Sequence, residues 1–158
     1  LYRAMKVDGP YEPEASAIGR RSLAITALGY LAKTRSVDEI LSECFDESSN
    51  LTERFAAYRI ARSDGSEELS ERLSNNFLAG AETDEVLDLW LSTEAMNEST
   101  ATIDRLHELM SHERFAWTNP NRVRAVFASI NACAFAATIF INGPPCVPGK
   151  IAPLIFFV

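Results

Sequence analysis

Hydrophobic positions recur every three or four residues from about residue 12 to residue 111, and polar residues fill the positions between them. This spacing places apolar side chains on one side of an α-helix, and the strict alternation that indicates a strand is almost absent. Polar connections between the runs are short, so successive helices must pack antiparallel. The pattern predicts helices over about residues 15–33, 36–45, 51–62, 66–77, 83–91, 100–111 and 121–130.

Several local signals refine these helices. Ser36 followed by Glu39 fits a capping box, in which each side chain bonds the other residue's backbone N–H. Thr83 is a good N-cap for a later helix. The buried face of the first helix is expected to carry Leu23, Ala27, Leu28 and Leu31.

The cadence of short paired helices predicts an all-α fold in which antiparallel helix pairs form an α-solenoid of the HEAT or armadillo kind. A compact helical bundle is the alternative. The expected organisation is an irregular N-terminal segment at 1–11, a helical repeat domain at 12–134 and an irregular, atypical tail at 135–158.

The tail departs abruptly from the helical pattern. From Phe135 onward the only charged residue is Lys150, and prolines break up a strongly apolar sequence. Proline interrupts a helix, and the apolar content is too high for a solvated linker. The pattern suggests a misread frame or an artificial end, and the chain is interpreted as a fragment of a longer protein.

Composition restricts the partners more than it identifies them. The chain has 158 residues, 47% of them hydrophobic, and a formal net charge of −7. An acidic chain does not favour nucleic acid, and no apolar run is long enough to span a membrane. The cysteines Cys44, Cys133 and Cys146 are too far apart for a CxxC pair, which fits a reducing, cytoplasmic location.

Two segments resemble catalytic motifs but do not fit them. His107 and His112 are five residues apart, so on a helix their side chains diverge by about 140° and cannot share a zinc ion. The carboxylates of Glu94 and Glu98 are interpreted as part of a solvated helix end. No phosphate-binding loop, nucleophile elbow or Cys/His couple is present, so neither a catalytic residue nor a metal ligand is predicted.

The segment around Pro120 is the one candidate binding site. Asn119 precedes proline and should be extended, and Asn121 is expected to cap the following helix. Arg122 and Arg124 would point about 160° apart on that helix. One arginine could therefore pair with neighbouring helices while the other faces an open surface and supplies a positive group to an anionic ligand. The alternative is that both arginines make salt bridges.

Here the sequence resembles a known family. The stretch from His112 to Phe115, the sequence Asn-Pro-Asn-Arg-Val-Arg at 119–124, Phe127, and Asn131 to Phe135 resemble the C-terminal helical domain of bacterial-type aminopeptidase N. Weaker matches lie at 50–54 and 88–90. The resemblance covers roughly residues 12 to 135 and diverges in the tail.

The resemblance implies a zinc metallo-aminopeptidase as the parent protein, which removes N-terminal residues from peptides. Its zinc ligands, its general-base glutamate and its GAMEN motif would lie in an earlier catalytic domain, so this fragment alone would be no enzyme. The helical domain would wall a chamber that admits peptides. Arg124 is the expected chamber-facing residue that binds the carboxylate-bearing end of a peptide, and Asn121 and Arg122 would support it.

Two other functions remain open at this stage. A free-standing helical-repeat scaffold that binds a protein or a peptide would show the same helical pattern. A small independent hydrolase would require this chain by itself to cleave an alanyl amide. The catalytic domain of the same polypeptide and peptide substrates are the expected partners.

Overall fold

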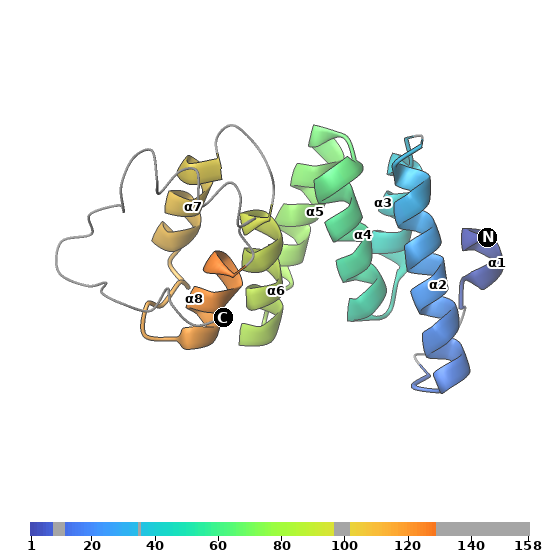
Figure 1. Cartoon of the computed structure of the whole chain (residues 1–158), viewed down its shortest axis with the longest axis horizontal. Coiled ribbons are helices and arrows are strands. Elements are labelled where there is room, and N and C mark those ends of the chain that lie inside the picture. Colours follow the sequence, from blue (N-terminus) through green and yellow to red (C-terminus); the bar gives the residue numbers. More distant parts are fainter. Residues whose placement is uncertain (8–11, 35, 97–101, 129–158) are drawn as a thin grey trace.

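The computed structural model describes residues 1–7, 12–34, 36–96 and 102–128, and all regular secondary structure in these ranges is α-helical (Figure 1). None of the helices in these ranges has the combination of length and hydrophobicity needed to cross a bilayer. The helices are α1 (Tyr2–Met5), α2 (Ala15–Ala32), α3 (Asp38–Glu47), α4 (Leu51–Asp64), α5 (Glu67–Ala79), α6 (Asp84–Ala95), α7 (Thr102–Ser111) and α8 (Pro120–Phe127).

The helices form an elongated array in which each packs on helices one or two places away in the chain. α1 packs on α2, α3 packs on α4, and α4 packs on α5, while α6 contacts both α7 and α8. Contacts between α2 and α4, and between α4 and α6, align these three helices in one layer. α1 and α2 lie at one end and α7 and α8 at the other (Figure 1). This order confirms the predicted helical repeat and excludes the compact bundle for the described residues.

The predicted domain boundaries are not tested by this arrangement. Within the segment expected to be irregular, residues 2–5 form the short helix α1, which packs on α2. The tail at 135–158 lies outside the described residues, as do Cys133 and Cys146. The division into three segments stays a prediction.

Side-chain caps define where several helices begin. The Asn50 side chain accepts a hydrogen bond from Glu53 N at 3.0 Å, and Thr83 caps α6 as predicted. The predicted capping box at Ser36 is wrong. Helix α3 begins at Asp38 after Val37, whose buried side chain enters the core, and the Ser36 side chain is exposed. Burial of Val37 therefore determines this helix start in place of a polar cap.

The buried face of α2 differs from the predicted one. Leu23 is 43% exposed, whereas Ala24, Leu28 and Ala32 are buried at intervals of four residues. The two alanines on this face are small, so α2 can lie close to α1 and α4. Only Leu28 of the predicted stripe is fully buried, while Ala27 and Leu31 are partly exposed.

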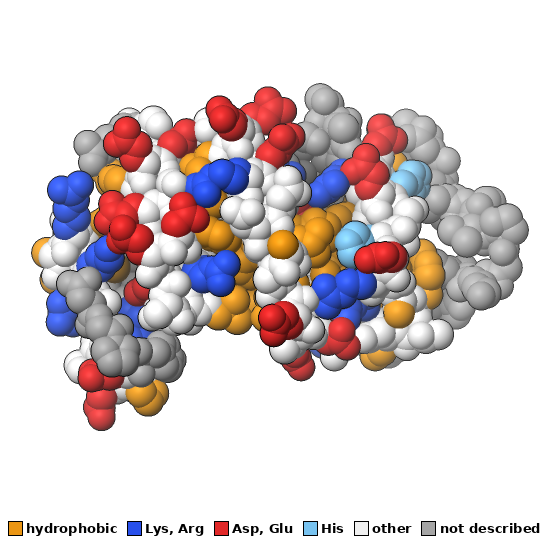
Figure 2. Space-filling model, turned by 180° about the vertical axis from the view of Figure 1, so that it is seen from behind, with side chains coloured by type: hydrophobic (Ala, Val, Ile, Leu, Met, Phe, Trp, Pro, Cys, Tyr) orange, Lys and Arg blue, Asp and Glu red, His pale blue; other side chains and the backbone are white. Residues whose placement is uncertain are grey.

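The core lies where α2, α4 and α6 pack against the other helices, and it runs along the length of the array. Tyr58 on α4 stacks on Phe77 of α5 with ring centroids 4.9 Å apart, and Phe55 lies beside both rings. The face seen in Figure 2, behind the view of Figure 1, carries scattered acidic and basic side chains, with hydrophobic side chains visible between the helices. Burial of these apolar side chains holds the packed helices together.

Replacing Asn50 with alanine should lower the free energy of unfolding by about 1 kcal/mol, because Glu53 N loses its acceptor at the start of α4. The matched control is Ser36→Ala, which removes a hydroxyl that caps nothing and should change stability by less than about 0.5 kcal/mol. Urea denaturation followed by circular dichroism measures both. A Ser36→Ala loss as large as the Asn50→Ala loss would contradict the observed start of α3.

Candidate functional site

The segment at the start of α8 is built around an asparagine cap. Asn119 is extended, as expected before proline, and its Oδ1 accepts hydrogen bonds from Asn121 N at 3.0 Å and Arg122 N at 3.4 Å. Pro120 is the first helical residue, where its missing N–H costs nothing. The prediction that Asn121 caps the helix is wrong. The helix already begins at Pro120, and the Asn119 side chain accepts hydrogen bonds from the backbone N–H groups of its first turn.

Arg122 joins α8 to α6. Its side chain is 3% exposed, and Nη2 donates to Asp84 Oδ1 at 2.7 Å. Nε lies 3.1 Å from Asp88 Oδ1, but neither atom has a partner in hydrogen-bond geometry, so this second contact is an ion pair only. Burial raises the pKa of Asp88, and the nearby charges of Asp84 and Glu85 add to this rise while Arg122 opposes it. Arg122 therefore acts as a structural cation between two helices.

Arg124 lies on a different side of α8. Its side chain is exposed, and within the described residues it makes no ion pair or side-chain hydrogen bond. Asn121 is exposed as well. One arginine is thus buried in a helix contact and the other faces open surface, as the helical spacing predicts. Binding of a peptide by Arg124, Asn121 or Arg122 stays a prediction.

A second polar group lies in the middle of the array, around Glu94 on α6. The interpretation of Glu94 as part of a solvated helix end is wrong, because its residue is 1% exposed and its side chain is inaccessible to water. The helix does end here, at Ala95, but it ends between neighbouring helices that cover this face. Glu98, the other carboxylate of that interpretation, lies outside the described residues.

Donors from three neighbouring helices surround the Glu94 carboxylate. Oε1 accepts hydrogen bonds from Tyr58 OH at 2.6 Å, Ser74 Oγ at 2.7 Å and Arg62 Nε at 3.0 Å. Oε2 accepts from Arg62 Nη2 at 2.8 Å and from Arg105 Nη2 at 2.7 Å. Two guanidinium groups therefore neutralise one buried carboxylate, which we call, with its four partners, the Glu94 cluster.

Hydrogen bonds beyond the cluster hold its donors in place. Trp90 Nε1 donates to Ser74 Oγ at 3.0 Å, and Arg62 Nη1 donates to Ser70 Oγ at 2.9 Å. Arg105 also donates to Glu108 at 2.9 Å, and its guanidinium lies over the Trp90 ring, 5.9 Å from the centroid. These contacts fix the orientation of the donors toward Glu94.

The electrostatics of the Glu94 cluster suit a structural role better than proton transfer. Burial would raise the pKa of Glu94, but hydrogen bonds from Tyr58 and Ser74 and the charges of Arg62 and Arg105 outweigh it and lower the pKa. Burial, followed by the Glu94 charge, raises the pKa of Tyr58. The lowered pKa favours the anionic form of Glu94 and the raised pKa favours the neutral form of Tyr58, so neither group is suited to exchange a proton near neutral pH.

Comparison with known proteins places this arrangement in a family. The family described as "Domain of unknown function (DUF3458_C) ARM repeats" matches residues 1–138. The chain belongs to this ARM-repeat family. The match includes the residues before Glu12, where the resemblance seen in the sequence did not extend.

Individual relatives point to a larger protein. The ARM-repeat domain is 29% identical over 139 residues to aminopeptidase N of Escherichia coli K12, covering 80% of this chain and 15% of the relative. It is 26% identical over 140 residues to aminopeptidase N of Caulobacter vibrioides, covering 85% of this chain and 16% of the relative. The resemblance to aminopeptidase N is confirmed, and this chain spans about 15% of the length of these relatives.

The two histidines of the ARM-repeat domain lie in separate surroundings. His107 is exposed on α7, whereas His112 follows the helix and packs on Trp90 with ring centroids 5.5 Å apart. His112 Nδ1 accepts a hydrogen bond from Arg114 N at 3.2 Å, which occupies that ring nitrogen. Within the described ranges, no three His, Cys, Asp or Glu residues are grouped so that they could hold a metal ion.

The signal that could have located the Glu94 cluster is polar residues at core positions. Arg62 follows Tyr58 by four residues on α4, and Glu94 follows Trp90 by four on α6. Each pair therefore shares one helix face, on which the first member is buried. A polar residue in register with a buried aromatic indicates a buried polar contact, although the sequence does not show which partners meet.

Replacing Glu94 with glutamine should lower the free energy of unfolding by about 3 kcal/mol, because Arg62 and Arg105 lose their carboxylate while the side-chain shape is kept. The matched control is Asp46→Asn, which breaks an exposed ion pair with Arg72 and should cost less than about 1 kcal/mol. Urea denaturation gives both values. Equal losses in the two variants would contradict the structural role of Glu94.

The stability that Glu94 provides should depend on pH. Its folded-state pKa is lowered below the ordinary value of 4.5, so as pH falls below 4.5 the unfolded chain binds the proton first. The stability difference between the natural chain and Glu94→Gln should be full above that value and shrink as pH falls through the folded-state pKa. The opposite effect of Asp88, whose pKa is raised, is common to both proteins and cancels. A difference that grows on acidification would contradict the assignment.

Proposed function

We propose that this chain is the C-terminal helical domain of a larger zinc aminopeptidase and forms part of the wall of its peptide chamber. The observation that carries the proposal is the ARM-repeat family match over residues 1–138, together with relatives named aminopeptidase N. Because the chain spans about 15% of those relatives, the greater part of such an enzyme would be supplied by other segments.

The zinc ion would be held by another part of the polypeptide. The described residues of this chain do not fit a zinc site, since His107 and His112 lie in different environments and no third ligand accompanies either. This chain would contribute a rigid surface in place of catalytic groups. A layered helical array held together by buried polar contacts can exclude water and folded proteins from one side.

Arg124 would supply a positive charge on this wall. Its exposed guanidinium is available to a ligand, unlike that of Arg122, which is already bound to α6. In a confined space with low dielectric constant, a guanidinium attracts the carboxylate-bearing end of a peptide more strongly than it does in bulk water. Asn121, exposed one turn earlier, could add a hydrogen bond to the same ligand.

We further propose a cytoplasmic location, supported by the wide spacing of the cysteines.

A free-standing scaffold that binds a protein or peptide is the second candidate, favoured by the open groove between α2, α4 and α6 that is described below. The gene decides between the two functions. An open frame upstream that encodes a GAMEN motif and an HExxH motif with a downstream glutamate supports the aminopeptidase. A start codon directly before this segment, with a stop codon upstream of it, contradicts it.

The purified chain should show no hydrolysis of an alanyl chromogenic amide, with or without added zinc, because it lacks a metal site among its described residues. The parent enzyme encoded by the complete frame should cleave the same amide. The measurement is release of the chromophore under identical conditions. Zinc-dependent cleavage by the chain alone would show that it is an independent hydrolase.

In the parent enzyme, Arg124→Ala should raise KM for peptides with a free carboxylate about tenfold, the effect expected when one charge-assisted hydrogen bond is lost. The value of KM for an alanyl amide, which has no carboxylate, should stay the same and serves as the control. Steady-state kinetics with the two substrates separates these effects. An equal change for both substrates would show that Arg124 acts on folding or on the catalytic centre.

A further inference from the structure

A groove crosses the layer formed by α2, α4 and α6, and no residue of α8 lines it. It encloses about 830 Å³ and opens to solvent. Part of its apolar lining is exposed to solvent, since Tyr30 is 73% and Met96 is 54% exposed. The apolar side chains that line it are Ile25, Tyr30, Ala56, Ile60 and Met96.

The groove is positively charged although the chain is acidic. The cations Lys33, Arg59 and Arg62 line it with a single acid, Asp64, while the whole chain has a net charge of −7. Lys33 Nζ bonds Asp64 Oδ1 at 2.7 Å, and Arg62 is bound to Glu94. Two of the three cations are therefore already neutralised by partners within the domain.

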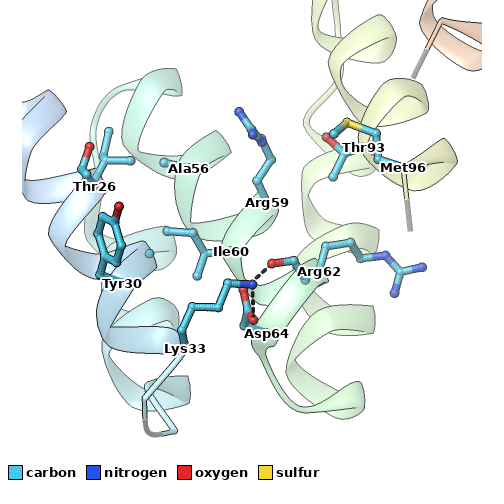
Figure 3. A pocket seen from close by; sticks show the side chains of 13 residues that line it. Thr26, Tyr30, Lys33, Ala56, Arg59, Ile60, Arg62, Asp64, Thr93 and Met96 are labelled. Carbon is cyan, nitrogen blue, oxygen red and sulfur yellow. Dashed lines mark hydrogen bonds and ion pairs between the residues drawn. The ribbon is translucent and has the colours of Figure 1, made fainter. Parts of the chain in front are cut away.

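Arg59 differs from the other two cations. It is exposed, it has no carboxylate partner within the described residues, and its guanidinium lies 5.6 Å from the centroid of the Phe55 ring. Figure 3 shows its side chain extending from α4 on its own, while Lys33 turns to Asp64 at the other end of the groove. A ligand with one negative charge would complement Arg59, which alone among the three cations lining the groove has no carboxylate partner in the described part of the chain.

We propose that this groove binds the C-terminal end of an extended peptide, with the terminal carboxylate on Arg59 and apolar side chains against Ile60 and Tyr30. The proposal rests on the proposed function for the class of ligand. The C-terminal carboxylate is the one anionic group that every peptide carries, whatever its sequence, so a chamber that admits many peptides can always bind it. Peptides of different lengths would place this group at different points of the wall, so a position besides Arg124 is useful.

Gly29 provides a way to close the groove without disturbing the fold. It lies in the last turn of α2 and lines the groove, and a Cβ atom added there would meet nothing within 4 Å. Gly19, on the same helix, has equally open surroundings but does not line the groove. Leucine has a higher helix propensity than glycine, so either substitution should leave the helix intact or more stable.

The test measures binding of a fluorescein-labelled peptide, Gly-Gly-Ala-Leu-Leu with a free carboxylate, to the complete chain by fluorescence anisotropy. The same peptide with a C-terminal amide should bind about tenfold more weakly, as should the free acid to Arg59→Ala or Gly29→Leu. Arg59→Lys, which keeps the charge, should recover part of the affinity. The controls Gly19→Leu and Arg72→Ala, the latter removing an exposed arginine of α5, should bind as the natural chain does.

Other outcomes overturn the proposal. These are no binding by the natural chain at about 1 mM protein, equal binding of acid and amide, or equal effects of Gly29→Leu and Gly19→Leu. An amidated peptide with an internal glutamate that binds as tightly as the free acid would show that any acidic segment suffices. Circular dichroism identifies a variant that fails to fold. Peptide binding is measured on this chain, whereas the aminopeptidase proposal is tested by the DNA sequence upstream. The two proposals can therefore fail independently.

Discussion

The array depends on the neutralisation of one buried carboxylate. Glu94 on α6 has no contact with water, and its charge is balanced by Arg62 from α4 and Arg105 from α7, with Ser74 from α5 as a further donor. A buried charge without such partners would be strongly destabilising. Four consecutive helices must therefore meet at one point in one geometry, which apolar packing alone would leave less strictly defined.

The helices themselves could be predicted from the sequence, because an amphipathic period is a local property and each helix buries one face. The errors occurred where tertiary packing outweighs a local signal. Ser36 and Glu39 have the right spacing for a cap, but Val37 enters the core and the helix starts after it. Leu23 is more hydrophobic than Ala24, yet the smaller residue faces the neighbouring helices because it allows closer approach.

The same distinction separates the two polar sites. The divergence of Arg122 and Arg124 follows from helix geometry and could be predicted, although the aspartates that bind Arg122 lie 34 and 38 positions earlier in the chain. Glu94 could not be placed, because its partners Tyr58 and Arg62 precede it by 36 and 32 positions. Pairings over such distances depend on how helices stack, and a single sequence does not reveal them.

Repeat arrays commonly diversify when whole units are duplicated or lost, because each unit touches only its neighbours. The Glu94 cluster limits that freedom here. Removal of any helix from α4 to α7 would delete a donor or the acceptor itself and leave a buried polar group with fewer partners. Duplication and loss are therefore expected to be confined, over evolutionary time, to the ends of the array, while the stretch from α4 to α7 is inherited as one block.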